Sequence, residues 1–153
     1  MKLLEHKIPP PMVAGLVGLA MWGVSSLQPL FPLDLRYRQF VVVVLGVAGI
    51  TFDFLGLLVF LRSKTTINPM TPHKTSTLVT GGIYRITRNP MYVGLALLLT
   101  AWAIHLDSLR TFLGPPLFIL YIGQFQIQPE EKVLKRIFGE EYAMYAARVR
   151  RWL

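Results

Sequence analysis

The chain of 153 residues contains no cysteine, and it has only half as many acidic as basic residues. Without thiols it can form no disulfide, thiolate metal site or cysteine nucleophile. Its three histidines, His6, His73 and His105, are too scattered to form a metal site at a usual ligand spacing, so no metal is expected. Sixteen Lys and Arg against eight Asp and Glu give a formal net charge of +8.

A charge of this sign can indicate nucleic-acid binding, but here the basic residues flank long apolar segments. Hydrophobic residues make up 53% of the chain and the mean hydropathy is +0.48, well above the values of ordinary soluble domains. Basic residues beside apolar segments are typical of membrane proteins. We therefore expect one integral membrane domain, residues 1–153, in contact with membrane lipids and not with nucleic acid.

Four apolar segments predict about four transmembrane helices, near residues 12–27, 40–61, 91–104 and 109–125. The second is long enough to cross a hydrocarbon core of ~30 Å at a rise of ~1.5 Å per residue. No small-residue cleavage site comes after the first, so it is interpreted as a retained helix. A polar turn at residues 105–108 predicts a hairpin of the last two, with a kink at Pro115–Pro116 in its second arm.

The basic residues also predict an orientation. Thirteen of the sixteen lie in the N-terminal residues, in the loop 62–90 or after residue 128. Four spans would place these three regions on one face, which the positive-inside rule makes cytoplasmic. Both termini are then cytoplasmic, at the inner membrane of a prokaryote or the endoplasmic reticulum of a eukaryote. On this topology residues 80–92 and the pair Glu130–Glu131 share a side and can form one site.

Residues 128–153 predict an amphipathic, interfacial helical tail. Pro129 suits a first helical turn, and Glu130 and Glu131 suit the positive end of a helix. Gly139 is expected to bend or break this helix. Apolar positions fall on one face on both sides of that break: Val133, Leu134, Ile137, Phe138, Tyr142, Tyr145 and Val149.

Asp53 lies about eight residues inside the second predicted span, roughly 12 Å from its end at the α-helical rise. A carboxylate within the membrane is costly, and it is therefore a candidate for function. The alternative interpretation is a hydrogen bond to a neighbouring helix that serves assembly.

Residues 80–94, T-G-G-I-Y-R-I-T-R-N-P-M-Y-V-G, lie where a basic loop meets the third predicted span. A helix start at Asn89–Pro90, with Arg88 just outside it, can attract anions. The same residues also fit ordinary membrane-interface roles, such as an arginine that reaches lipid headgroups. Gly81–Gly82 lacks the spacing and βαβ context of a dinucleotide site, so no Rossmann domain is expected.

The sequence L-V-T-G-G-I-Y-R-I-T-R-N-P-M-Y-V-G, a helical hairpin and then P-E-E-K-V-L-K-R-I-F-G-E-E-Y-A-M-Y resemble the isoprenylcysteine carboxyl methyltransferase family. That family is part of a wider group that includes phospholipid N-methyltransferases. The resemblance covers about residues 74–153 and leaves residues 1–73 as a two-span scaffold. It implies an all-α membrane enzyme that uses S-adenosylmethionine, with the C-terminal segment capping a cytosolic cofactor pocket. A lipophilic substrate would enter from the bilayer.

The resemblance also implies site residues. Those expected to bind the cofactor are Ser76, Thr77, Leu78, Val79, Tyr84, Asn89, Pro90, Met91, Tyr92 and Glu130. Asn89 replaces the family's histidine, and Gln126 stands where the family has an arginine for the substrate carboxylate. Methyl transfer from a sulfonium needs alignment and a dry cavity more than an acid, and tyrosine rings can hold a cation. Gln126, Arg88 and Asp53 are the catalytic candidates.

Several alternatives stay open at the level of sequence. The methyl acceptor can be a carboxylate, a phospholipid amine, a thiol or a phenolic lipid, and Gln126 argues against the carboxylate because an amide substitutes poorly for a guanidinium. A membrane reductase that uses NADPH is a second class of enzyme. A four-helix transporter or assembly protein is a third; there Asp53 would be central, and Tyr84, Asn89 and Glu130 would be dispensable.

Overall fold

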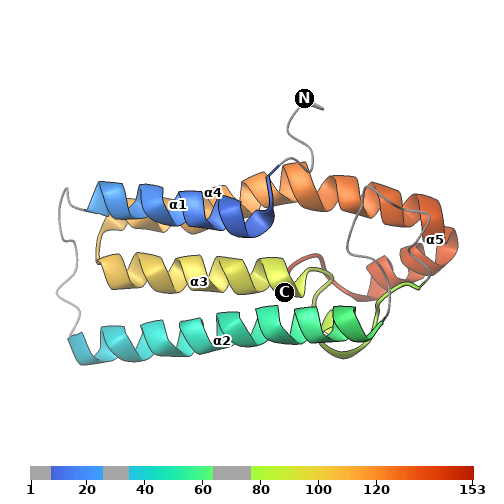
Figure 1. The fold of residues 1–153 in the computed structure, drawn as a ribbon, viewed down its shortest axis with the longest axis horizontal. Coiled ribbons are helices and arrows are strands. Elements are labelled where there is room, and N and C mark those ends of the chain that lie inside the picture. The colour runs from blue at the N-terminus through green and yellow to red at the C-terminus, as the bar shows by residue number, and fades with distance from the viewer. Residues whose placement is uncertain (1–7, 26–34, 64–76) are drawn as a thin grey trace.

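The computed structural model describes residues 8–25, 35–63 and 77–153, which form helices joined by turns. Figure 1 shows the four helices α1 to α4 side by side, with α5 continuing from α4 beyond one end of the bundle and then folding back. Short 3-10 helices precede α3 and α4, and a π-helical turn joins α4 to α5. In chain order the elements are α1 (Pro10–Ser25), α2 (Leu35–Arg62), η2 (Gly82–Arg85), α3 (Pro90–Leu106), η3 (Leu109–Leu113), α4 (Gly114–Ile122), η4 (Gly123–Ile127) and α5 (Gln128–Arg148).

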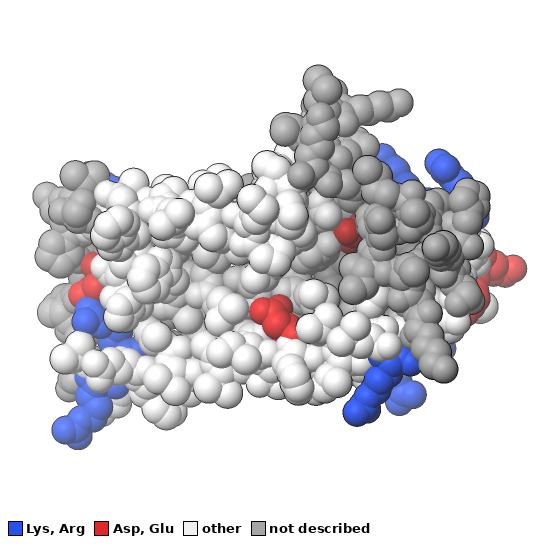
Figure 2. Space-filling model, in the orientation of Figure 1, with Lys and Arg blue, Asp and Glu red and all other residues white. Residues whose placement is uncertain are grey.

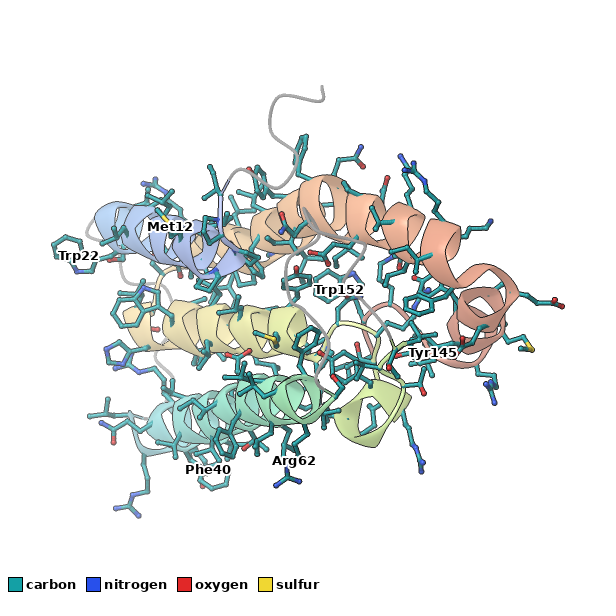
Figure 3. The ribbon with its side chains drawn as sticks, turned by 45° about the vertical axis from the view of Figure 1, so that its right-hand side comes forward. Met12, Trp22, Phe40, Arg62, Tyr145 and Trp152 are labelled. Carbon is teal, nitrogen blue, oxygen red and sulfur yellow. The ribbon has the colours of Figure 1, made fainter. Side chains whose placement is uncertain are left out.

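The buried core lies between α1, α3 and the α4–η4 segment. Its members are Val13, Ala14, Met21, Leu99, Ala103, Phe118, Ile122 and Ile127. The outward faces of the helices are also apolar, as the exposed Trp22 and Phe40 illustrate (Figure 3). An apolar exterior around a small core is unfavourable in water, but it suits a hydrocarbon environment.

Helix α2 packs against α3 through three glycines that permit a close approach. A Cβ added at Gly49 would lie 2.9 Å from the Gly94 carbonyl oxygen, and one at Gly94 would lie 2.7 Å from the Gly49 carbonyl oxygen. A Cβ at Gly56 would meet Pro90 and Met91 at 3.0–3.1 Å. Small residues at such a seam allow helix backbones to approach closely where no hydrophobic effect drives association. Asp53 lies on this seam, beside Gly94.

Within the described ranges, α2 is the helix that is long and apolar enough to cross a membrane, with 28 residues. The apolar helices α1 and α3 are shorter, with 16 and 17 residues. Charged side chains gather mainly toward the two ends of the molecule, and the flank between them is mostly uncharged in the view of Figure 2. At the end opposite α5, Arg38 and Asp107 form an ion pair that links α2 to the turn after α3.

The helix boundaries lie within a few residues of those predicted, but the last third of the chain differs in two respects. Pro115 and Pro116 do not kink a helix: they occupy the first turn of α4, where their missing N–H groups cost nothing. Pro129 does lie in the first turn of α5, as predicted, but the chain is already helical before it, because α4, η4 and α5 run on continuously. The π turn just before Pro129 widens the helix, and there the Gln128 N–H bonds to the Gly123 carbonyl.

The predicted break at Gly139 is confirmed. Its backbone has φ +50° and ψ −115°, a conformation that glycine adopts without a Cβ penalty. The two arms of α5 on either side of Gly139 therefore fold toward one another, and the chain returns to the end of the bundle where α3 begins (Figure 1).

Candidate functional site

The first wall of the site is the turn that leads into α3. Gly82 has φ +57°, and a Cβ there would lie 2.8 Å from Val59 of α2, so both backbone and space require glycine at this position. The 3-10 helix η2 then carries Tyr84, and α3 begins at Pro90, as predicted. Asn89 occupies the N-cap position of α3, but its side chain makes no capping bond.

The second wall is the first arm of α5, which meets α3 through a pair of polar side chains. The Tyr92 hydroxyl donates a hydrogen bond to Glu130 Oε1 at 2.8 Å. Gln126, one helical turn before Glu130, lies near both side chains and opposes the rise in the pKa of Glu130. The prediction that the 80–92 region and the acidic pair come together is therefore confirmed.

Burial has the largest effect on the pKa values of Glu130 and Tyr84. It raises the pKa of Glu130 to about 7, and the hydrogen bonds from Tyr92 and Gln126 only partly oppose that rise because they favour the charged form. Burial, assisted by the negative charge of Glu130, raises the pKa of Tyr84 to about 12. Tyr84 is thus close enough to sense the carboxylate. Tyr84, Tyr92, Gln126 and Glu130 form one cluster, which we call the Glu130 cluster.

Glu131, the next residue along the chain, has different partners. It accepts two hydrogen bonds from Arg151, at 3.1 and 2.7 Å, and its Oε1 lies 3.2 Å from an Arg88 guanidinium nitrogen. Arg88 also donates to the Tyr142 hydroxyl at 3.2 Å, while its Nε is buried without a hydrogen-bond partner in the described structure. Two guanidinium groups on one carboxylate leave this cluster with an excess of positive charge.

A second set of bonds joins the start of α3 to the segment after α5. Thr87 Oγ1 and Asn89 Nδ2 both donate to the Arg151 carbonyl, at 3.2 and 2.9 Å. The Arg88 backbone N–H donates to the Arg150 carbonyl at 3.0 Å. From the second arm of α5, the Tyr145 hydroxyl donates to the Tyr84 carbonyl at 2.7 Å. The second arm of α5 and the segment after it therefore hold the turn that carries Tyr84.

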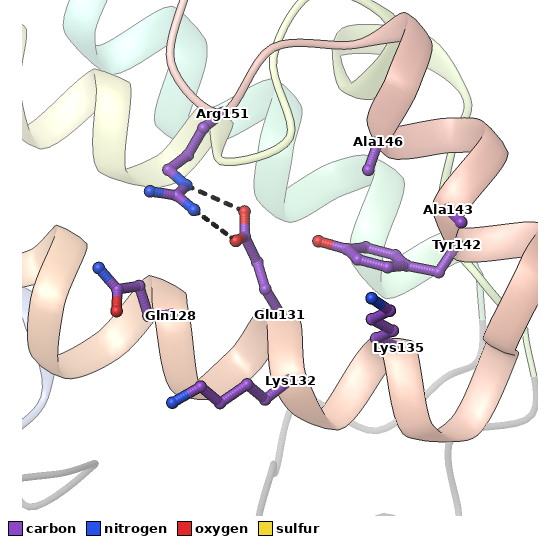
Figure 4. Close-up of a pocket in the computed structure, with 8 residues that line it drawn as sticks. All are labelled: Gln128, Glu131, Lys132, Lys135, Tyr142, Ala143, Ala146 and Arg151. Atoms are coloured by element: carbon purple, nitrogen blue, oxygen red, sulfur yellow. Dashed lines mark hydrogen bonds and ion pairs between the residues drawn. The ribbon is translucent and has the colours of Figure 1, made fainter.

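A cleft of about 400 Å³ opens beside Glu131, between the two arms of α5. Figure 4 shows Glu131 and Tyr142 pointing toward one another across it, with Arg151 above Glu131. The residues that line the cleft are mostly basic or polar, together with Glu131 and two alanines. They are Gln128, Glu131, Lys132, Lys135, Tyr142, Ala143, Ala146 and Arg151.

Of the other predicted site residues, those that the structure describes lie in the segment just before the first wall or on the seam between α2 and α3. Ser76 is outside the described residues. Thr77 is exposed, whereas Leu78 and Val79 are half-buried. Pro90 and Met91 face α2 at Gly56, on the packing seam.

Asp53 is half-buried on the same seam, and its Oδ1 is enclosed without a hydrogen-bond partner in the described part of the chain. Its geometry favours a packing role, and its part in chemistry stays a prediction.

Sequence reasoning missed several residues that organise this region. Thr87 is fully buried, and Tyr142 and Tyr145 use their hydroxyls, although only an apolar face was predicted for them. The sequence indicates Arg151 only as part of a basic tail. The one available signal was that the apolar face contains two tyrosines, since a buried tyrosine usually finds a hydrogen-bond partner.

Comparison with known proteins matches most of the chain to a family. The family model described as phospholipid methyltransferase matches residues 37–141, which include α3, α4 and most of α5. An uncharacterized protein of Haemophilus influenzae is 49% identical over 63 residues, which are the whole of that protein and 41% of this chain. No solved structure matches the chain.

Proposed function

This chain belongs to the phospholipid methyltransferase family, and on that premise we propose that it transfers a methyl group from S-adenosylmethionine to a lipophilic acceptor that enters from the bilayer. The cofactor would lie against the Glu130 cluster, with α5 and the residues after it as its cap. Bound there, S-adenosylmethionine would supply an electrophilic methyl group on a sulfonium. The protein would contribute by binding the two reactants and aligning them.

The observation that carries this proposal is the half-buried carboxylate of Glu130. It accepts a hydrogen bond from the neutral Tyr92 hydroxyl but has no ion pair within the described ranges, while Glu131 takes both arginines. Burying a carboxylate without a counter-charge is costly. A site with this arrangement suits a ligand that brings its own positive charge, and S-adenosylmethionine carries an ammonium and a sulfonium.

The neighbouring charges complement the rest of the same ligand. The excess positive charge of Arg88 and Arg151 around Glu131 suits the carboxylate of the methionine moiety. The faces of Tyr84 and Tyr92 are suited to hold the sulfonium, since aromatic rings attract cations. Gln126 would help to orient Glu130, and the half-buried setting would limit the access of water to the methyl group.

The acceptor is best described as a neutral or basic lipid group. An acidic acceptor of the isoprenylcysteine type would need a guanidinium, but Gln126 takes the expected position, and Arg88 and Arg151 would already be used by the carboxylate of the cofactor. A phospholipid amine makes no such demand, and it agrees with the family that matches the chain. A thiol meets the same condition.

The proposed setting is a membrane crossed four times, with α1, α2, α3 and the α4–η4 segment as the spans. The beginning of α1, the turn before α3 and α5 all lie at one end of the bundle (Figure 1), which the basic residues would make the cytoplasmic end. The cofactor then arrives from the cytosol and the lipid from the side.

The test is calorimetric binding of S-adenosylmethionine to the detergent-purified protein, with NADPH as the competing ligand. Glu130→Gln keeps the shape of the side chain and removes its charge. Charge-assisted hydrogen bonds contribute roughly 1.5–3 kcal/mol, so affinity should fall about ten- to a hundredfold. Glu141→Gln, an exposed carboxylate on the same helix, is the matched control and should bind like the parent.

Two further variants locate the cation. Glu131→Gln should lower thermal stability, because it leaves two arginines without their carboxylate partner. It should change cofactor affinity less than Glu130→Gln does. Tyr84→Phe should bind better than Tyr84→Ala if the face of the ring holds the sulfonium. Parent-like affinity in a folded Glu130→Gln protein would place the cofactor elsewhere, and binding of NADPH in place of S-adenosylmethionine would favour a reductase.

A further inference from the structure

The five residues after α5, Val149–Leu153, form a non-helical segment that we call the strap. Val149 leaves the helix with φ −119° and ψ +131°, and the chain then runs back along residues 87–89. Two consecutive carbonyl groups of the strap, those of Arg150 and Arg151, receive all the hydrogen bonds that residues 87–89 donate to it.

The strap is also fixed on its other side. The Arg151 guanidinium binds both carboxylate oxygens of Glu131, one residue from Glu130. Trp152 packs against the buried core, and Figure 3 shows it lying inward among the helices. The main chain of the strap thus holds the start of α3, while the Arg151 side chain holds the first arm of α5.

Thr87 and Asn89 both bind the strap, but through different contacts. Thr87 is completely buried, and its hydroxyl both donates to the Arg151 carbonyl and accepts the Asn89 backbone N–H at 3.2 Å. The side-chain N–H of Asn89 is engaged by the same carbonyl. Tyr92 comes three residues later, within the first turn of α3, so the direction in which α3 starts decides where its hydroxyl meets Glu130.

We propose that the strap clamps the start of α3 to α5, and that Thr87 and Asn89 are positioning residues that act through it on the Tyr92–Glu130 contact. Asn89 is then not a ligand of the cofactor, although the family resemblance places it among the cofactor-binding residues. The clamp itself stands on the hydrogen bonds above, whereas its effect on cofactor binding rests on the proposed function.

The chemistry of the two side chains suggests paired variants. Thr87→Val keeps the volume and removes the hydroxyl, while Thr87→Ser keeps the hydroxyl. Asn89→Asp replaces the donor with an acceptor that faces a carbonyl oxygen, while Asn89→His restores a ring N–H donor. Ile86→Ala, in the same turn but exposed, is the control.

The first readout reports on the strap without reference to ligand. The chain has three tryptophans, so Trp22→Phe and Trp102→Phe leave Trp152 as the sole reporter. In this background we expect Thr87→Val and Asn89→Asp to shift Trp152 emission to the red and to increase its quenching by acrylamide. Thr87→Ser, Asn89→His and Ile86→Ala should match the parent. An unchanged Trp152 signal in both disruptive variants would overturn the clamp.

The second readout is the dissociation constant for S-adenosylmethionine in the same proteins. Loss of the bonds to the strap should weaken binding about tenfold, the equivalent of one ordinary hydrogen bond, and Asn89→His should restore it. A released Trp152 with parent-like affinity would overturn the positioning role. If the parent itself fails to bind S-adenosylmethionine, the proposed function is overturned, and the Trp152 signal still decides whether the clamp exists.

Discussion

At the scale of single residues, Glu130 and Glu131 are neighbours on one helix but bind different partners. Successive residues on an α-helix point about 100° apart. One carboxylate therefore faces α3 and the Tyr92 hydroxyl, while the other faces Arg88 and Arg151. The first is half-buried without a counter-charge in the described structure, and the second is the centre of an ion-pair cluster. Substituting each should give a different kind of defect.

The raised pKa of Glu130, about 7 against an ordinary value of 4.5, predicts two pH dependences of opposite sign. Between these values the folded protein binds more protons than the unfolded chain, so the free energy of unfolding should decrease as pH rises from 4.5 to 7. The affinity for a cationic cofactor should instead increase over the upper part of that range, because only the carboxylate attracts it.

Thermal unfolding and calorimetry over that range check both trends in detergent. Glu130→Gln removes the titrating group, so it should flatten the two profiles together. If the profiles of Glu130→Gln keep the slopes of the parent, another group titrates and Glu130 is not responsible.

Several polar residues of this site can be identified from the sequence, but their hydrogen-bond partners cannot. The acidic pair, and the apolar positions on both sides of Gly139, identified the face of α5 that matters. The bonds of Thr87 and Asn89 could not be predicted, because their acceptors are main-chain carbonyl groups more than sixty positions away. A carbonyl group is present at every residue and leaves no signature in the sequence.

At the scale of elements, the α2–α3 seam depends on glycine. A Cβ at Gly94 would lie 2.6 Å from Asp53 Cγ and 2.7 Å from the Gly49 carbonyl oxygen. Gly94→Ala should therefore push the helices apart and destabilise the protein by about 1–3 kcal/mol, the usual cost of overpacking. Gly46→Ala, on the same α2 but with nothing within 4 Å, should be neutral or stabilising. Equal unfolding midpoints for the two variants in detergent would contradict this packing.

The variant Asp53→Leu tests whether the seam between α2 and α3 also has a function. A carboxylate within a span normally opposes insertion, so Asp53→Leu should improve insertion if the group is incidental. We expect instead a loss of turnover or of assembly, because Asp53 fills the space beside Gly94. Methyl-transfer rate and unfolding midpoint are measured together. Unchanged turnover at equal or higher stability would show that the carboxylate has no task.

Helices were predicted well where a long apolar run determines them, and less well where proline is involved. Pro115, Pro116 and Pro129 all lack the N–H that a helix interior needs, and each was expected to disturb or begin a helix. Pro129 lies in the first turn of α5, as predicted, whereas Pro115 and Pro116 lie in the first turn of α4 in place of the predicted kink. Which of these outcomes occurs depends on whether tertiary contacts keep the helix continuous, and the sequence does not encode that locally.

At the scale of the whole molecule, the charged ends and the apolar flank predict a topology that can be measured. The chain has no cysteine, so single cysteines can be introduced without a background. Cysteines at Arg85 and Arg148, both exposed at the α5 end, should be protected from an impermeant thiol reagent in intact cells. A cysteine at Tyr37, exposed at the start of α2, should react.

Reaction at Arg85 in intact cells would place the Glu130 cluster on the wrong side for a cytosolic cofactor. Protection of Tyr37 together with the other two would mean that α2 does not cross the membrane. The cells are lysed and labelled again as a control, so that a buried cysteine is distinguished from one behind the membrane.

The π turn at Gly123–Ile127 also bears on how this protein tolerates insertions and deletions. A single π turn holds one residue more than the regular helix around it. Removing one residue there can convert the turn to regular α-helix and leave Glu130 on the face that meets Tyr92. Removing one residue from the regular helix of α4 would instead rotate the downstream helix by about 100° and present a different side chain to Tyr92. We therefore expect length differences among homologous chains to collect at residues 123–127 and to be absent from α4.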